Sequence, residues 1–156
     1  MELPLLNLPT YPLRRRYMNG SEQIFDTVRH RWVALTPEEW VRQHVVAHLV
    51  ALKYPIGRIS NEFALTFNGQ SRRCDTVVFD VYGRPLLIVE YKAPYIAITQ
   101  AVFDQVAVYA LQLNVPFLLL SNGLTHVCCK IDRQQRRYLF AAQPFVPYEQ
   151  LCHSVL

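Results

Sequence analysis

Two short stretches that are apolar without interruption constrain the fold of this chain more than any other feature. They are residues 86–89 (LLIV) and residues 117–120 (FLLL). Side chains alternate across a strand, so a strand that is apolar at every position is buried on both faces, as central strands of α/β proteins are. The first stretch runs into Glu90 and Lys92, and charged residues next to a buried strand are costly unless they have partners.

The pattern of apolar residues around these stretches predicts two helices and five strands. A helix is expected to begin after Thr36, a favourable N-cap, with Glu39 completing a capping box. The dipeptide Asn68-Gly69 predicts a hairpin turn, and Gly83 marks the next turn. The predicted elements are a helix over 37–53, strands over 59–67, 73–80 and 85–91, a helix over 97–113, and strands over 117–120 and 125–131.

This order predicts a mixed α/β fold with a central sheet of four to five strands flanked by helices. The third and fourth strands are expected to be parallel and joined by a right-handed crossover. A length of 156 residues, 51% of them hydrophobic and 18% charged, suits one globular domain. We expect its core at residues 36–135, an irregular N-terminal extension at 1–35 that packs on the core, and a C-terminal extension at 136–156.

Charge and cysteine content restrict the function classes only in part. The net charge of +4 is compatible with a polyanionic partner. The four cysteines contain no CxxC pair and are interpreted as reduced apolar residues. No secretory signal and no apolar run of about 20 residues is present, so we expect a cytoplasmic protein without a membrane partner. No Gly-Lys pair occurs, which argues against a P-loop motor in this sequence.

Three polar residues are expected to converge at one end of the predicted sheet. Glu90 and Lys92 are two residues apart and therefore face the same side. If the strands on either side of Gly83 pair as a hairpin, Asp75 meets Glu90. Two carboxylates beside one amine suit Mg²⁺, with water completing the metal's shell. A metal-activated water is a nucleophile at neutral pH, and a nearby lysine can orient it or offset charge on phosphate.

A purely structural interpretation competes with this hypothesis. Glu90 and Lys92 taken alone are typical of a solvated ion pair at a strand end. Asp75, fifteen residues earlier on the adjoining strand, favours a site because three polar residues then share one location.

These residues resemble the signature of PD-(D/E)xK nucleases, whose core order is αβββαβ. The pattern is most similar to the N-terminal nuclease domain of type I restriction enzyme R (HsdR) subunits. The matching segments, in the family's order, are TPEEWVRQ, RRCDTVVFD, LLIVEYKAP, FDQVAVYA and LLLSNG, within residues 12–132. Cys74 stands where the signature has a proline, a position that is widely dispensable.

The resemblance implies a role for each matching residue. Asp75 and Glu90 correspond to metal ligands, and Lys92 corresponds to the catalytic lysine. Gln105 and Tyr109 match a Q-x-x-x-Y element that related nucleases place beside the active site, and a spacing of four puts them on one helix face. Tyr109 is explained equally well by core packing.

Two further acids are candidates for the metal site. Glu39 corresponds to the family's first-helix acid, although its capping-box role explains it as well. Glu62, on the first predicted core strand, is a secondary candidate. The candidates for contact with DNA phosphates are Arg14, Arg15, Arg16, Arg42, Arg58, Arg72 and Arg73, with Arg42, Arg72 and Arg73 preferred, although a solvated surface position is the default for most of them.

The sequence therefore predicts a Mg²⁺-dependent DNA endonuclease, with Mn²⁺ able to substitute, that hydrolyses phosphodiesters with metal-activated water. The expected partners are DNA and, by resemblance, restriction-modification subunits or a motor on another chain. The alternatives are a non-catalytic nucleic-acid-binding or assembly module that keeps the nuclease fold, and an α/β domain whose polar rim is structural.

Overall fold

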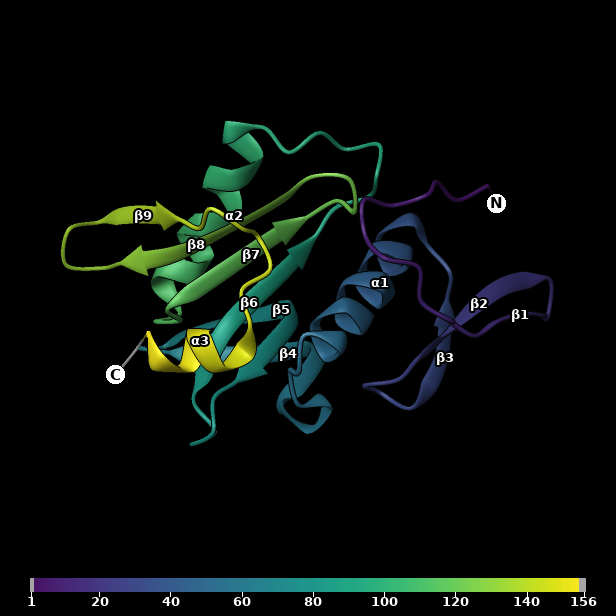
Figure 1. Cartoon of the computed structure of the whole chain (residues 1–156), viewed down its shortest axis with the longest axis horizontal. Helices are drawn as coiled ribbons and strands as arrows, with labels where there is room; N and C mark the ends of the chain where they lie inside the picture. The colour runs from purple at the N-terminus through teal and green to yellow at the C-terminus, as the bar shows by residue number, and fades with distance from the viewer. Residues whose placement is uncertain (1, 155–156) are drawn as a thin grey trace.

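The computed structural model describes residues 2–154, which form two sheets flanked by helices (Figure 1). The smaller sheet contains β1 (Arg15–Met18), β2 (Ser21–Asp26) and β3 (Arg31–Ala34). The larger sheet contains, in spatial order, β4 (Ile59–Phe67), β5 (Gln70–Phe79), β6 (Pro85–Tyr91), β7 (Phe117–Ser121), β8 (His126–Asp132) and β9 (Arg137–Phe140). The helices are α1 (Pro37–Ala51), the 3₁₀ helix η1 (Ile56–Arg58), α2 (Gln100–Gln112) and α3 (Tyr148–His153).

The larger sheet is mixed, which confirms the predicted fold class. Its neighbouring strands are antiparallel except β6 and β7, which are parallel and joined through α2, as expected of the third and fourth core strands. Helices α1 and α3 lie on one face of the sheet and α2 on the other (Figure 1). None of the helices within residues 2–154 is long and apolar enough to cross a membrane.

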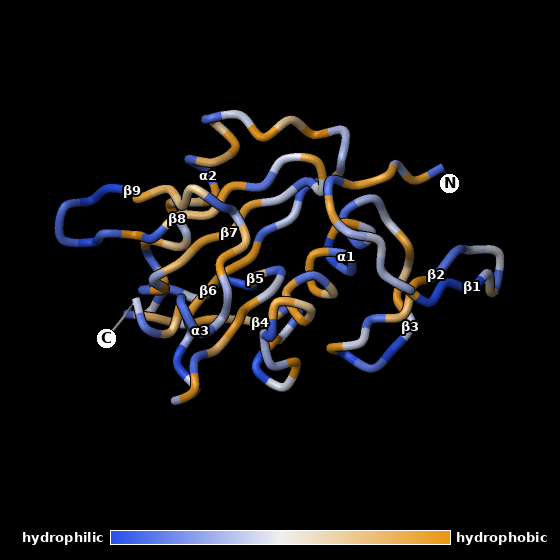
Figure 2. Tube along the Cα trace, viewed as in Figure 1, coloured by the Kyte–Doolittle hydropathy of each residue, from blue (hydrophilic) through white to orange (hydrophobic). Residues whose placement is uncertain are grey.

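The two uninterrupted apolar stretches lie in β6 and β7, at the centre of this sheet (Figure 2). Leu87, Val89 and Leu119 belong to the hydrophobic cluster that includes α1 and α3. Ile88 and Leu118 belong to the cluster that includes α2. All five side chains are at most 2% exposed, because each face of the two strands is covered by a helical layer.

The prediction of an irregular N-terminal segment was wrong. β1, β2 and β3 form an antiparallel meander that lies beside α1 (Figure 1). Its first turn is Asn19-Gly20, in which both residues have positive φ (52° and 78°), the conformation that a two-residue hairpin turn requires. That dipeptide is the signal that the sequence offered for a strand pair here.

The larger sheet has six strands, one more than the upper limit expected. The additional strand, β9, pairs with β8 from Cys129↔Phe140 to Asp132↔Arg137, so it follows the core directly within residues 136–156. Helix α3 lies in the same segment, and its Tyr148 and Leu151 are buried against the α1 face of the sheet. A strand of four residues with an arginine and two exposed apolar side chains carries little periodic signal.

A buried polar network ties the meander to the larger sheet. The carboxylate of Asp26, which is fully buried, accepts hydrogen bonds from Asn61 Nδ2 (2.9 Å) and Arg29 Nε (2.6 Å). Asn61 Oδ1 accepts from Thr76 Oγ1 (2.7 Å), which accepts in turn from the Tyr91 hydroxyl (2.9 Å). Burial raises the pKa of Asp26, but the hydrogen bonds from Arg29 and Asn61 outweigh it and lower the pKa overall. The meander is thereby linked to the strand that carries Glu90.

Three histidines held neutral inside the fold predict a loss of stability in mild acid. Burial lowers the pKa of His44, His48 and His126 below the ordinary value of 6.5. A lowered folded-state pKa contributes stability that is present above pH 6.5 and is lost as the pH falls through the folded-state value. We therefore expect the free energy of unfolding to fall between pH 7 and pH 5. Urea denaturation at several pH values measures it.

The variant His44→Gln provides the control for this prediction. Gln cannot take up a proton, and its amide can replace the ring nitrogen Nδ1 that contacts the Trp40 carbonyl oxygen at 2.8 Å. The decrease in stability between pH 7 and pH 5 should be smaller in this variant than in the wild type. An equal decrease in both proteins would assign the acid sensitivity to other groups.

Candidate active site

Asp75 and Glu90 are brought together by the pairing of β5 with β6. Thr76 pairs with Val89 in this ladder, so the next position along places Asp75 beside Glu90. Asp75 Oδ2 accepts a hydrogen bond of 2.9 Å from the backbone nitrogen of Tyr91. Val77 and Ile88, a neighbouring pair, point toward α2, and alternation puts the Glu90 carboxyl group on that side, where it is hydrogen-bonded to Asp75. The predicted meeting of these two residues is therefore present.

The electrostatics of this pair favour the uptake of positive charge. Burial, followed by the negative charge of Asp75 and the hydrogen bond between the two carboxyl groups, raises the pKa of Glu90 to about 9. Arg72 opposes this shift without cancelling it. A carboxyl pair of this kind binds a proton or a cation more favourably than it holds two negative charges. Its hard oxygen atoms are the donors that Mg²⁺ and Mn²⁺ prefer, so the two residues fit a divalent metal.

Lys92 follows β6 directly and is partly exposed. Its backbone nitrogen donates to the carbonyl oxygen of Ser121 (2.9 Å), which holds the residue at the end of the strand. Within residues 2–154, its ammonium group forms no ion pair or hydrogen bond, and it is not among the charges that act on Glu90. The solvated Glu90–Lys92 ion pair that the sequence left open is therefore not formed, and the ammonium group is available to a ligand.

Arg42 occupies the other side of Asp75 and is buried there. It lies on α1, is 6% exposed, and its Nη2 is 2.6 Å from Glu62 Oε1 and 4.0 Å from Asp75 Oδ1. Its Nε is 3.8 Å from Glu39 Oε2. Among residues 2–154, Nε and Nη1 have no hydrogen-bond partner. Arg42, which the sequence suggested for DNA contact, thus faces three carboxylates inside the protein instead of the solvent.

Glu62 is held by two arginines. It pairs with Arg42 and with Arg73, whose Nε is 2.8 Å from Glu62 Oε2 and whose side chain is 68% exposed. Burial raises the pKa of Glu62, but the hydrogen bond and charge of Arg42 and the charge of Arg73 lower it overall. Its backbone has a φ of +55°, which costs a non-glycine residue about 1–2 kcal/mol. The residue lies next to Asp75 in the β4–β5 ladder, so these ion pairs hold a strained position beside the carboxyl pair.

Glu39 forms only half of the predicted capping box. Its backbone nitrogen donates to Thr36 Oγ1 (3.0 Å), which confirms Thr36 as the N-cap of α1. Its carboxylate accepts from Gln43 Nε2 (2.8 Å) and Arg29 Nη2 (3.2 Å). Arg42 therefore separates this acid from Asp75, and the structure does not bring Glu39 to the Asp75–Glu90 pair.

Arg72 and Tyr109 border the pair on its other side. The guanidinium carbon of Arg72 lies 2.9 Å from the centre of the Tyr109 ring, and its charge acts on Glu90. In the described part of the chain, the buried Arg72 Nε has no hydrogen-bond partner. Gln105 is exposed on α2, one turn before Tyr109. Tyr109 therefore contacts the guanidinium of Arg72, and core packing alone does not describe its environment.

The number of acidic ligands in one place is small. Among residues 2–154, no group of three or more His, Cys, Asp or Glu side chains is arranged to hold a metal ion. Glu39 and Glu62 are engaged with arginines, which leaves Asp75 and Glu90 as the acidic donors. The site therefore offers two carboxylates, one ammonium group and one stacked guanidinium.

Sequence reasoning missed the residues that hold Tyr91, and through it Asp75, in position. Tyr91, whose backbone nitrogen binds Asp75, is fixed through its hydroxyl by Thr76, Asn61 and Asp26. The only signal was the presence of polar Asn61 and Thr76 within two strands that are otherwise largely apolar on that face. Their partner Asp26 lies in the segment that was expected to be irregular.

Residues 37–143 match the family described as type I restriction enzyme R protein N terminus (HSDR_N). Among solved structures, the chain is similar to a fragment of a candidate HsdR subunit of a type I restriction enzyme from Vibrio vulnificus YJ016, with 20% identity and a TM-score of 0.50. That match covers 76% of this chain but 26% of the other, so this chain spans about a quarter of the fragment.

A second solved structure is a candidate nuclease of the DUF820 group from Anabaena variabilis ATCC 29413. It has 14% identity and a TM-score of 0.47, and the match covers 96% of this chain and 95% of that protein. No curated protein matches the sequence. At 20% identity the Vibrio structure supports the fold alone, whereas the family match covers more than half of the chain.

Proposed function

Because this chain belongs to the family of type I restriction enzyme R protein N termini (HSDR_N), we propose that it is a metal-dependent DNA endonuclease. The observation that carries this proposal is the partly buried Asp75–Glu90 pair, with the pKa of Glu90 raised to about 9, next to the unpaired ammonium group of Lys92. Phosphodiester hydrolysis requires acids that bind a metal cation and a cationic group that contacts the phosphate. The carboxyl pair can serve as the acids, and the ammonium group of Lys92 as the cation.

Each group has a defined part in this proposal. Asp75 and Glu90 hold the metal, Mg²⁺ or Mn²⁺, through their carboxylate oxygens. When bound, such a metal activates water and draws charge from the phosphate oxygens. Lys92 orients the attacking water or stabilises the negative charge that grows on the phosphate as the bond to it forms. The backbone nitrogen of Tyr91 fixes the orientation of Asp75 (2.9 Å).

The residues around the pair are proposed to position the DNA. The guanidinium of Arg72 lies over the Tyr109 ring, a contact that orders the group, and we propose that it donates to a phosphate oxygen. Arg73 is 68% exposed and can exchange Glu62 for a phosphate. Gln105, exposed on the same face of α2 as Tyr109, is proposed to contact the substrate. Arg42 is a positioning residue, since it is buried and contacts Glu62 and Asp75.

The partners of this domain are also proposals. This chain spans about a quarter of the HsdR fragment to which it is similar. We propose that other restriction-modification subunits, or a motor on another chain, supply sequence recognition and translocation where these are needed.

A cleavage assay tests the proposed function. We expect the purified protein to nick or linearise plasmid DNA, and to cut linear DNA, with Mg²⁺ or Mn²⁺ and not with EDTA. The matched control is Asp75→Asn, which keeps the size of the side chain and removes the metal ligand. If wild-type protein binds DNA but leaves it uncut, alone and with candidate partner subunits, the non-catalytic binding module becomes the better description.

A further inference from the structure

The outer face of the N-terminal meander presents arginines stacked on aromatic rings. Arg14 pairs with Phe25 across β1 and β2, since Phe25 N donates to Arg14 O (3.0 Å), and Phe25 pairs with Trp32 on β3. The guanidinium carbon of Arg14 is 3.7 Å from the centre of the Phe25 ring, and that of Arg16 is 4.3 Å from the Trp32 ring. Phe25 and Trp32 meet edge to face, with their centroids 5.3 Å apart. We call these four residues the arginine–aromatic face.

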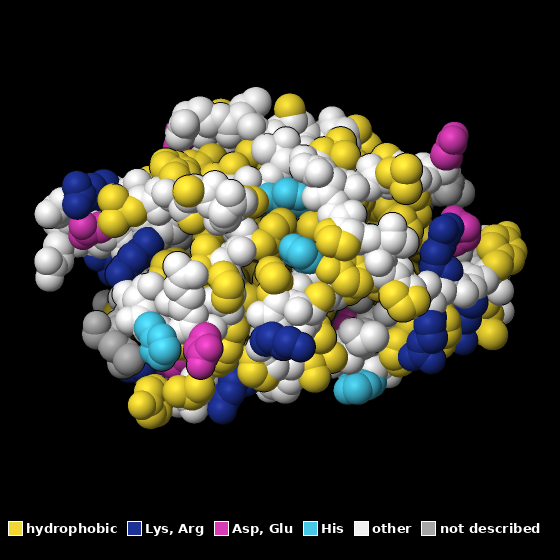
Figure 3. Space-filling model, in the orientation of Figure 1, with side chains coloured by type: hydrophobic (Ala, Val, Ile, Leu, Met, Phe, Trp, Pro, Cys, Tyr) yellow, Lys and Arg dark blue, Asp and Glu magenta, His cyan; other side chains and the backbone are white. Residues whose placement is uncertain are grey.

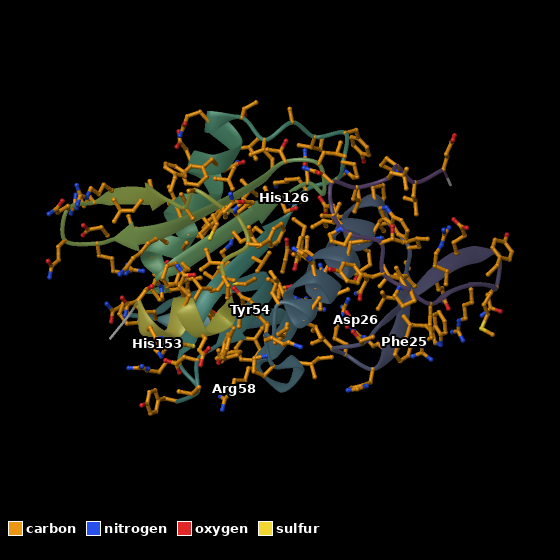
Figure 4. All side chains as sticks on the ribbon, in the orientation of Figure 1. Phe25, Asp26, Tyr54, Arg58, His126 and His153 are labelled. Carbon is orange, nitrogen blue, oxygen red and sulfur yellow. The ribbon has the colours of Figure 1, made fainter. Side chains whose placement is uncertain are left out.

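This face points away from the rest of the protein. Figure 4 labels Phe25 and Asp26, with Asp26 the nearer of the two to α1. Ile24 and Asp26 are fully buried, whereas Phe25 and Trp32 are partly exposed, as strand alternation requires. Figure 3 shows Lys and Arg side chains beside hydrophobic ones at the end of the molecule formed by the meander.

The charge of the face is positive and uncompensated. The two acids of β2, Glu22 and Asp26, occupy the other face, where Glu22 pairs with Arg15 (3.1 Å) and Asp26 with Arg29 (2.6 Å). Arg14 and Arg16 form no ion pair with any residue between 2 and 154. Arg16 Nε donates to Gln23 Oε1 (2.7 Å), which holds its guanidinium in place over Trp32.

The stacking selects the kind of partner. A guanidinium that lies on an aromatic ring is ordered, and its N–H donors point outward in the plane of the group, where they can meet phosphate oxygens in pairs. The guanidinium groups of Arg14 and Arg16 occupy the faces of the Phe25 and Trp32 rings on which bases of a single strand would otherwise stack. The arginine–aromatic face is therefore suited to contact with a phosphate backbone and not to base stacking.

We propose that the arginine–aromatic face binds the phosphate backbone of duplex DNA and anchors the substrate away from the site of cleavage. This inference rests on the proposed function, since it adds a second contact region for the same substrate. The contact carries no sequence preference, because phosphates are the same along any duplex. It also explains why an enzyme with a modest net charge of +4 concentrates ordered arginines on one small sheet.

The test compares two double variants that lose the same charge. Arg14→Gln with Arg16→Gln removes the cations of the face. Arg84→Gln with Arg137→Gln removes two arginines outside the meander, 61% and 56% exposed, each of which pairs with an aspartate. Duplex DNA affinity is measured without divalent metal, so that no cleavage occurs, at several salt concentrations, with circular dichroism as the folding control.

The face variant is expected to bind duplex DNA at least about 10-fold more weakly, with a salt dependence less steep by about one to two units of slope, while the control pair changes little. Equal losses in both pairs, or no loss in the face variant, overturn the inference. If the face variant binds and cleaves like wild type, the proposed function stands without it. If wild type neither binds nor cuts DNA, both fail.

Trp32 gives a local readout of the same contact. In a Trp40→Phe background, Trp32 is the only tryptophan, and its fluorescence is expected to change on addition of duplex DNA because the cation stacked on it engages a phosphate. A change that disappears with Arg14→Gln and Arg16→Gln supports direct contact at the face. Unchanged fluorescence at saturating DNA, or stronger binding to a single strand than to the duplex, contradicts it.

Discussion

Replacement of Lys92 with alanine is expected to lower the rate of DNA cleavage at least about 100-fold, the usual scale for losing an electrostatic or acid-base group. DNA binding and the fold should change little, since the ammonium group has no hydrogen-bond or ion-pair partner among residues 2–154 that would be left unsatisfied. A group that acts mainly on the transition state affects the rate more than the affinity. Lys92→Arg should not restore cleavage, because a planar guanidinium replaces a compact ammonium poorly.

Lys130→Ala is the matched control for Lys92. Lys130 pairs with Phe117, at the end of β7 opposite to Ser121, and its Nζ contacts the carbonyl oxygen of Ser154 (2.6 Å). Cleavage rates are compared at saturating Mg²⁺, with circular dichroism for each variant. If Lys92→Ala, Lys92→Arg and wild type cut at the same rate, Lys92 has no catalytic role, and its effect on stability should then be only about 0–1 kcal/mol.

The central part of the fold could be predicted because local patterns there agree with the tertiary structure. The strands at 59–67 and 85–91 have the predicted bounds, and α1 begins at the predicted cap. Their apolar residues alternate or repeat as burial demands, and Asn68-Gly69 has the positive φ values of a hairpin turn. β1 and β9 could not be predicted in this way, since strands of four largely exposed residues are defined by their neighbours and not by their own pattern.

In the candidate site, too, contacts set by local sequence could be predicted and contacts between distant elements could not. A hairpin turn at Gly83 was enough to place Asp75 at the same end of the strand pair as Glu90, but the exact pairing also depends on a register shift between Val78 and Phe79 that the turn does not reveal. The position of Arg42 could not be derived, since its contact with Glu62 joins a helix to a strand twenty residues later and depends on how the two pack. Because of the same packing, the carboxylate of Glu39 binds Arg29 and Gln43 and does not serve as the second half of the capping box with Thr36.

Removal of either acid of the pair is expected to abolish thermal stabilisation by metal. Mg²⁺, Mn²⁺ or Ca²⁺ at about 100 times its Kd adds about 2.7 kcal/mol to a protein that binds it only when folded, which raises Tm by roughly 5–10 °C for a domain of this size. Asp75→Asn and Glu90→Gln should each remove this rise. The pKa of Glu90 is already raised to about 9, so Gln resembles the neutral acid of the metal-free protein and should leave its stability nearly unchanged.

The variants Glu39→Gln and Glu62→Gln test whether the two acids outside the Asp75–Glu90 pair contribute to metal binding. Glu39 is bound by Arg29 and Gln43, and Glu62 is bound by Arg42 and Arg73, so neither carboxylate is free to bind a cation. Both variants should therefore keep the rise in Tm with metal, although each begins from a lower Tm because a partly buried arginine loses its partner. The measurement is Tm by differential scanning calorimetry with and without metal in all four variants. A rise that survives Asp75→Asn and Glu90→Gln but disappears with Glu39→Gln would move the metal site from the end of β6 to α1.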